Sequence, residues 1–274
     1  SKSMRTVAVL TVDIRVPHYA RTAYTIEREF SRRGYEVILC NTGGDRAETL
    51  RYLQVVNQKQ VDGIVLVGSV FDTICQGAEM EKLLTGVPVV LANGKLDLPN
   101  AYSVTVDDKY GVSLAVEHLV ARGRKSIYYI KDRDTDSAKS KRDGFLEAMR
   151  RNGLEFADHV LEAGETLASG METVQALLAQ GIVPDGIVCG EDLTAAGALK
   201  ALLRAGLRVP GQVAVVGFNN SDYAHLCEPV LTSVDNKPEQ VALLCVQLLE
   251  SSIERSEAYS SVVLQPELAQ GETS

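Results

Sequence analysis

The 274-residue chain contains no tryptophan, and aromatic residues make up only 5% of it. Its longest apolar runs, such as Gly63 to Val67, have the length of a strand, so we expect no segment that spans a membrane. The five cysteines are widely spaced and include no CxxC pair, which argues against a disulfide framework. Reduced, mostly buried thiols and the lack of a recognisable signal peptide favour a cytoplasmic protein.

Positive charge is also scarce, because 28 lysines and arginines stand against 36 acidic residues, for a net charge of −8. A surface that binds nucleic acid needs clustered cations to displace counterions, and the basic runs in this sequence are short. We therefore expect that the chain itself binds neither DNA nor an anionic membrane. The remaining composition, 45% hydrophobic and 23% charged, is typical of a folded globular protein of one large or two medium domains.

Motifs for common enzyme chemistries are missing as well. The sequence contains no GxGxxG or GxxxxGK[ST] phosphate loop, no HExxH and no GxSxG. The four histidines do not have the spacing of metal ligands, and Cys189 has no histidine near it in sequence that would activate a thiol nucleophile. We expect no cofactor, no metal ion and no catalytic activity.

Short apolar runs alternate along the chain with amphipathic stretches of helical period. This alternation predicts parallel sheets that are covered by helices on both faces, which is an α/β fold. The predicted strands are Val7–Thr11, Glu36–Cys40, Gly63–Val67, Val89–Ala92, Ser103–Val106, Ile187–Gly190 and Val213–Phe218, and the first two predicted helices are Ala20–Arg33 and Ala47–Gln58.

The sequence repeats its own pattern after about 120 residues. Val61–Val65 (VDGIV) recurs as Pro184–Val188 (PDGIV), and Arg5–Leu10 (RTVAVL) has a counterpart in Lys125–Ile130 (KSIYYI). A pair of matching helix ends, RRG and RNG, has nearly the same offset. Three matches in register predict two similar lobes in tandem, with a ligand cleft between them at the carboxyl ends of the strands.

Polar side chains follow most of the predicted strands. Taken singly, each is more often a helix cap than a ligand contact, because Asp, Asn and Ser commonly cap helices. Taken together on one cleft they predict a pocket for a small polar molecule, since amides and carboxylates bind hydroxyl groups and an arginine forks onto a carboxylate or paired hydroxyls. These residues are Asp13, His18, Tyr19, Ser69, Asn93, Asp107, Asp108, Arg142 (expected at the start of a helix), Glu191, Asp192, Asn219 and Asn220.

Several segments resemble the effector-binding domain of the LacI/GalR family of bacterial transcriptional regulators. The most specific is Gly206–Pro210 (GLRVP), which continues into Val213–Asn220. Lys141–Phe145 (KRDGF) and Pro229–Val234 also match the family in order and spacing, and the resemblance extends over nearly the whole chain.

This resemblance implies a periplasmic-binding-protein-like fold of type I with two Rossmann-like lobes. One lobe would contain residues 5–105 and 238–259, and the other residues 106–237 and 260–274. The resemblance also implies a homodimer that holds operator DNA through an N-terminal helix-turn-helix headpiece, absent from this chain, and that responds to a sugar-like effector through movement of the lobes. Two alternatives stay open: a periplasmic sugar-binding protein of a transporter, and an enzyme that acts on a metabolite in the same cleft.

Two positions depart from the family's pattern. Glu191 stands where an amide is common, and Asn219 stands where a carboxylate is common. The pocket would keep its charge but exchange its donors and acceptors, so no particular sugar is implied. The other ligand contacts that the resemblance implies are His18, Tyr19, Asn93, Arg142 as the arginine that anchors the effector, and Asn236 as a weaker candidate.

Overall fold

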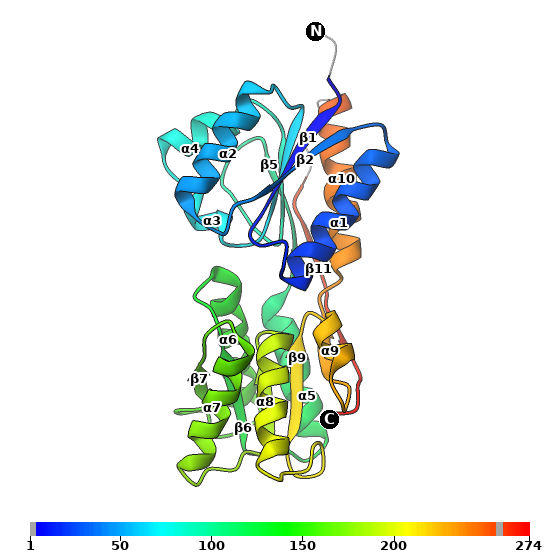
Figure 1. Ribbon diagram of the computed structural model, residues 1–274. Helices are drawn as coiled ribbons and strands as arrows, with labels where there is room; N and C mark the ends of the chain where they lie inside the picture. Colours follow the sequence, from blue (N-terminus) through cyan, green and yellow to red (C-terminus); the bar gives the residue numbers. More distant parts are fainter. Residues whose placement is uncertain (1–3, 256–259) are drawn as a thin grey trace. The chain divides into compact units, whose positions relative to one another are not determined.

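The computed structural model describes residues 4–255 and 260–274, which form two compact units (Figure 1). Unit 1 contains the described residues up to Val106 together with Lys237–Leu264, and unit 2 contains Asp107–Asn236 and Gln265–Ser274. The chain therefore passes between the units three times. The third boundary follows Leu264, whereas the sequence placed it near Ser260, and Tyr259, the predicted end of the first lobe, lies outside the described residues.

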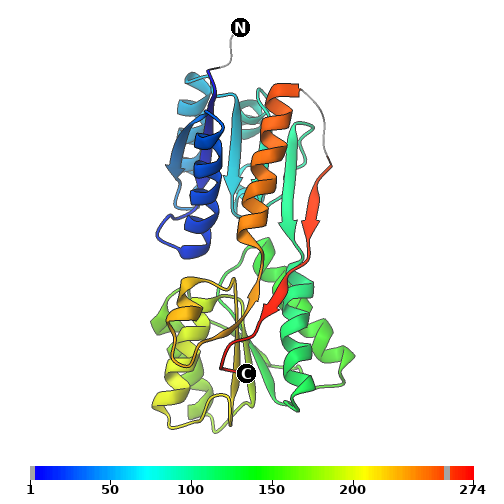
Figure 2. The same cartoon turned by 90° about the vertical axis from the view of Figure 1, so that its right-hand side faces the viewer.

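Unit 1 is built on a six-stranded parallel sheet with the strand order β11-β5-β4-β3-β1-β2. Its strands are β1 (Thr6–Thr11), β2 (Glu36–Asn41), β3 (Gly63–Val67), β4 (Val89–Ala92), β5 (Ala101–Val106) and β11 (Val262–Leu264). Its helices are α1 (Pro17–Arg32), α2 (Arg46–Gln58), α3 (Phe71–Ile74), α4 (Ala78–Leu84) and α10 (Pro238–Arg255). Figure 2 shows α1 and α10 side by side on one face of this sheet. Each face carries its own apolar core, as the almost continuously apolar strands require.

Unit 2 repeats this plan with the strand order β12-β10-β9-β8-β6-β7, in which only β12 runs antiparallel to its neighbour among the described strands. Its strands are β6 (Ile127–Lys131), β7 (Val160–Glu162), β8 (Gly186–Cys189), β9 (Ala214–Phe218), β10 (Thr232–Asp235) and β12 (Glu267–Ala269). Its helices are α5 (Asp108–Ala121), α6 (Asp136–Arg151), α7 (Leu167–Ala179), α8 (Asp192–Arg204) and α9 (Asp222–Leu226). The predicted fold of two Rossmann-like α/β lobes is confirmed.

Side-chain caps fix where several helices begin. Asp45, Asp107, Thr135 and Thr166 each accept a hydrogen bond from a backbone N–H in the first turn of the helix that follows. The cap at Thr135 starts α6 at Asp136, so Arg142 lies in the second turn of this helix. The expectation that Arg142 opens a helix was wrong, because the capping threonine stands seven residues earlier in the sequence.

Two helix pairs of unit 2 approach each other at glycines. A Cβ atom at Gly144 of α6 would lie 2.6 Å from the backbone oxygen of Lys109 in α5. A Cβ atom at Gly197 of α8 would lie 2.5 Å from the backbone oxygen of Leu167 in α7. Both close approaches are possible only because glycine has no side chain. The approach at Gly144 places α6 directly against the beginning of α5.

None of the described helices is long and apolar enough to cross a membrane. The five cysteines are free thiols, and all but Cys227 are buried.

Candidate functional site

The carboxyl edge of the unit 2 sheet brings together three of the residues that the sequence singled out. Glu191, Asn219 and Asn236, called the polar row below, follow the neighbouring strands β8, β9 and β10. Asn219 Nδ2 donates to Glu191 Oε2 at 2.5 Å, and Asn219 Oδ1 accepts from Asn236 Nδ2 at 2.8 Å. The polar row is thus a continuous run of hydrogen bonds along the edge.

The backbone places the middle member of the polar row. Asn219 has φ of 99°, a region that asparagine tolerates better than most residues, and its N–H donates to Val234 O at 2.8 Å. The side chain is only 3% exposed. At the end of the row, Asn236 Oδ1 is buried and has no hydrogen-bond donor among the described residues, whereas a buried amide oxygen is normally paired.

A buried lysine lies beside the polar row. Lys141 of α6 is 7% exposed, and its Nζ donates to Gly190 O at 3.0 Å and lies 4.0 Å from the centroid of the Phe218 ring. In the sequence, Lys141 was notable only as part of the segment Lys141–Phe145 that matches the family. A signal was present, because Lys141 occupies the same helical stripe as Ala138 and Phe145, which are buried core residues.

Carboxylates surround this lysine. The positive charge of Lys141 attracts Asp108 and Asp132. A second cation, Arg133, lies in the loop after β6, and its Nε is 3.4 Å from Asp132 and 3.7 Å from Glu191. Burial raises the pKa of Asp108, and burial together with the charge of Glu191 raises the pKa of Asp132. The sequence placed Asp108 after a strand but missed Asp132 and Arg133.

Asp192 supports the polar row from inside the protein. It is 1% exposed and accepts hydrogen bonds from Ser221 N at 2.7 Å, Ser221 Oγ at 2.8 Å and Ser233 Oγ at 2.7 Å. These bonds join the start of α8 to the segment after β9 and to β10 itself. Burial nevertheless raises the pKa of Asp192 to about 6.

Arg142, the predicted anchor of the effector, is more exposed than its neighbour Lys141. Its side chain is 37% exposed, and its Nη2 and Nε donate to Asp143 Oδ1 at 3.2 and 3.3 Å. The guanidinium is therefore countered by a carboxylate of its own helix.

The carboxyl edge of the unit 1 sheet holds the other predicted residues. Asp13, after β1, accepts from the backbone and the side chain of Arg15, and these hydrogen bonds lower the pKa of Asp13. The rings of His18 and Tyr19 lie 4.0 Å apart at the start of α1, and Tyr19 is 8% exposed within the core. At the ends of the neighbouring strands β3 and β4, the structure places Ser69 and Asn93.

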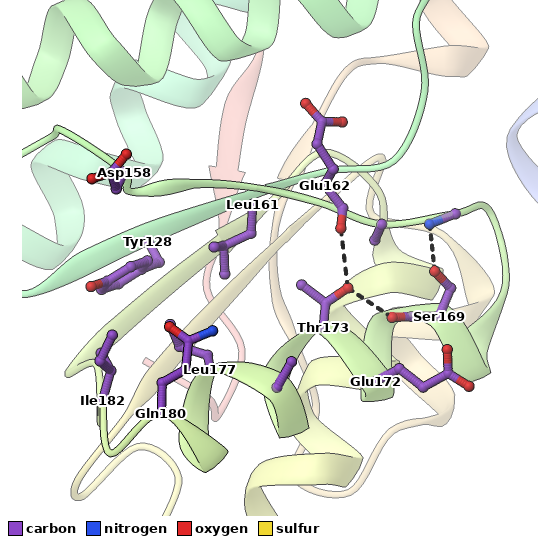
Figure 3. A pocket seen from close by; sticks show the side chains of 13 residues that line it. Tyr128, Asp158, Leu161, Glu162, Ser169, Glu172, Thr173, Leu177, Gln180 and Ile182 are labelled. Atoms are coloured by element: carbon purple, nitrogen blue, oxygen red, sulfur yellow. Dashed lines mark hydrogen bonds between the residues drawn. The ribbon is translucent and has the colours of Figure 1, made fainter.

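A separate pocket of about 790 Å³ lies between β7 and α7 of unit 2 (Figure 3). Thr173 Oγ1 donates to Glu162 O at its upper side, and Leu161 and Leu177 supply apolar walls. Of the described residues that line it, none is among the predicted ligand contacts. Among residues 4–255 and 260–274, no group of three histidine, cysteine or acidic side chains is placed to hold a metal ion.

Comparisons with known proteins identify the family. Residues 116–274 match the model of the periplasmic binding protein-like domain. An HTH-type transcriptional regulator of Lachnoclostridium phytofermentans is 31% identical over 250 residues, which covers 90% of this chain and 75% of that protein. The ribose operon repressor of Halalkalibacterium halodurans is 30% identical over 255 residues, which covers 93% of this chain and 74% of that protein.

A solved structure shows the same architecture. The periplasmic binding protein/LacI transcriptional regulator of Alkaliphilus metalliredigens, in complex with D-xylulofuranose, is 25% identical with a TM-score of 0.82, and 98% of each chain is covered. The two sheets and their strand-end polar residues define a periplasmic-binding-protein-like domain. The chain belongs to this family, and within it to the LacI-type transcriptional regulators. The predicted family is confirmed, and the relatives favour a regulator over the transporter protein.

Proposed function

We propose that this chain senses a small polar effector, a sugar or a sugar derivative, for a cytoplasmic regulator that binds operator DNA through a headpiece outside this chain. The effector is held by the strand-end residues of the two sheets and is released unchanged. In unit 2 they are the polar row, joined by Arg142 of α6, and in unit 1 they are Asp13, Ser69 and Asn93, joined by His18 and Tyr19 of α1.

The polar row carries this proposal. Its carboxylate and amide groups offer several acceptors and donors within one run of hydrogen bonds, and one buried acceptor, Asn236 Oδ1, is still open. A molecule rich in hydroxyl groups, each of which both donates and accepts, suits such a surface. Two relatives support the sugar class, since one is named a ribose operon repressor and another was solved with D-xylulofuranose.

Binding would control the regulator through a shift between two conformations. A ligand moves such an equilibrium only by the difference between its affinities for the two states, and the same coupling acts in reverse on DNA binding. We propose that the regulator works as a homodimer. The resemblance to LacI-type regulators is the basis for this, and we assign Leu226 of α9 to the interface because it is the most exposed large apolar side chain of the described residues, at 81%.

The proposal is tested by a thermal-shift screen of the purified domain against sugars, sugar acids, sugar phosphates and nucleosides. A ligand at 100 times its Kd adds about 2.7 kcal/mol to the free energy of unfolding and raises the Tm. We expect a hit in one chemical class. No shift with any class would contradict the proposal.

The Asn219→Asp variant then tests the polar row itself. An aspartate there cannot donate to Glu191 and places two carboxylates side by side, so the hit should lose at least about tenfold in affinity. Asn57→Asp, on the exposed side of α2, makes the same chemical change away from the row and should bind as wild type does.

A further inference from the structure

We propose that the unit 2 edge accepts only a part of the effector that carries no negative charge, and that the effector as a whole is an uncharged sugar or polyol and not a sugar phosphate or a sugar acid. This inference rests on the proposed function and narrows it. Its basis is that the three cations next to the polar row, Arg133, Lys141 and Arg142, each already contact a carboxylate or a carbonyl of the protein.

Negative charge exceeds positive charge around the polar row. Among the described residues, the cations whose contacts lie beside the polar row are Arg133, Lys141 and Arg142. The carboxylates that face them or each other are Asp108, Asp132, Asp143, Glu165, Glu191 and Asp192.

Lys141 is not available to an anion. Its Nζ is directed to Gly190 O at 3.0 Å and to the face of the Phe218 ring, and the residue is 7% exposed. Its charge also balances the half-buried Asp108 and the buried Asp132. If Lys141 turned to an effector phosphate, Asp108 would lose the cation that faces it and Asp132 would keep only Arg133, which is unfavourable.

Arg133 is occupied in the same way. Its Nε lies 3.2 Å from Glu165, 3.4 Å from Asp132 and 3.7 Å from Glu191, and its side chain is 17% exposed. One guanidinium thus serves three carboxylates. An anion that approached Glu191 would be repelled by it, with no unengaged cation from Arg133 to offset the repulsion.

Arg142 is the most exposed of the three cations, and it is paired with Asp143. Its charge is countered, while the guanidinium N–H groups that do not face Asp143 can still donate to hydroxyl groups. The nearby negative charge does not repel a hydroxyl group, because a hydroxyl is neutral and can donate a hydrogen bond to Glu191 or to Asn236 Oδ1. Of the three cations, Arg142 is thus the one that can still donate to the effector, and it does so beside a carboxylate that disfavours an anion.

The first experiment needs no knowledge of the effector. A bacterial metabolite extract is separated on an anion-exchange column into an unretained fraction and a retained fraction, and each is added to the purified chain at equal ionic strength in a thermal-shift assay. We expect the unretained fraction alone to raise the Tm. A Tm rise with the retained fraction alone would overturn this inference and leave the proposed function intact. If neither fraction raises the Tm, the proposed function fails and the inference falls with it.

The second experiment uses matched pairs: glucose and glucose 6-phosphate, glucose and gluconate, ribose and ribose 5-phosphate. For any pair of which one member binds, the anionic member should bind at least about tenfold more weakly. An anionic member that binds as tightly as its uncharged partner contradicts the inference.

Two variants test whether Glu191 causes the preference for uncharged over anionic ligands. Glu191→Gln keeps an acceptor for Asn219 but removes one of the carboxylates beside Arg133, so it should narrow the difference between the two members of a pair by at least about threefold. Glu172→Gln, an exposed position on α7, removes the same charge from the same unit and should leave the difference unchanged. Equal behaviour of the two variants would show that Glu191 does not set the charge preference.

Discussion

Glu191 and Asn219 stand where the family resemblance leads one to expect an amide and a carboxylate, and their contact explains why the two exchanges occur together. The Glu191 carboxylate needs a donor, and the Asn219 amide supplies it while its oxygen accepts from Asn236. A carboxylate at both positions would place like charges within hydrogen-bond distance. In this chain the side chain at position 219 is therefore the donor and the side chain at position 191 the acceptor.

Replacing Arg142 by alanine should weaken effector binding by about 2 kcal/mol or more, because a charged donor to the effector is lost. Isothermal titration with a ligand found in the thermal-shift screen measures the change. Lys139→Ala, an exposed cation on the same helix, is the matched control and should have wild-type affinity. Unchanged binding by Arg142→Ala would remove this residue from the site.

Asp192 makes the stability of the domain depend on pH in an unusual direction. Its pKa of about 6 in the folded protein lies above the ordinary value of 3.8, so the folded state holds the proton more tightly than the unfolded state. This contribution to stability is complete below the unfolded pKa and is lost as the pH rises through 6. Lowering the pH from 7 to 5 should therefore raise the free energy of unfolding by about 1 kcal/mol from this residue.

Urea unfolding at both pH values, followed by circular dichroism, measures this gain. Asp108 and Asp132 act in the same direction, since burial raises the pKa of both. The Asp192→Asn variant should therefore lose only the part of the stability gain at low pH that comes from Asp192. Asp158→Asn, at an exposed position with a positive φ that asparagine adopts readily, should keep the full dependence. A dependence on pH that is identical in Asp192→Asn and wild type would show that Asp192 does not titrate in this range.

The helices of unit 2 are positioned by close contacts that involve glycine. α6 lies so near the beginning of α5 at Gly144 that a methyl group would overlap the backbone of Lys109. Since α6 carries Lys141 and α5 begins with Asp108, this contact also sets the distance between the buried cation and its carboxylate.

We expect Gly144→Ala to lower the free energy of unfolding by about 1–3 kcal/mol, because the backbone atoms it meets cannot rotate away. Gly86→Ala is the control, since a Cβ atom there has no heavy atom within 4 Å beyond its own neighbours, and its effect should be small. Chemical unfolding of both variants measures the difference. Equal stabilities would mean that the helix pair adjusts without cost.

The regulator as a whole is proposed to work as a dimer, and Leu226 offers a direct test. Leu226→Glu would place a charge in an interface that buries this side chain, and burial of an unpaired charge is strongly unfavourable. Sedimentation velocity at micromolar concentration should show a dimer for wild type and a monomer for the variant. Val183→Glu, at a side chain that is 55% exposed in the same unit, should remain dimeric. A dimeric Leu226→Glu protein would show that Leu226 is not buried in the interface.

The sequence by itself determined the two-lobe α/β plan. Apolar runs of strand length alternate with amphipathic stretches of helical period, and the pattern repeats after about 120 residues, so both signals can be read without knowing any tertiary contact. Gly63–Val67 and Val89–Ala92 are strands with the predicted bounds, and Asn219 follows β9 as expected. The short elements α3, β7, β11 and β12 were not predicted, since three or four residues are too few to show a period.

Only the tertiary structure decided which strand-end residues touch. Glu191, Asn219 and Asn236 are separated by up to 45 residues and meet because β8, β9 and β10 are neighbours in the sheet. The same packing buries Lys141 among Asp108 and Asp132, whereas the sequence pointed to Arg142 next to it. Burial and the balance of charge depend on side chains from distant segments, so they arise only when the sheet is assembled.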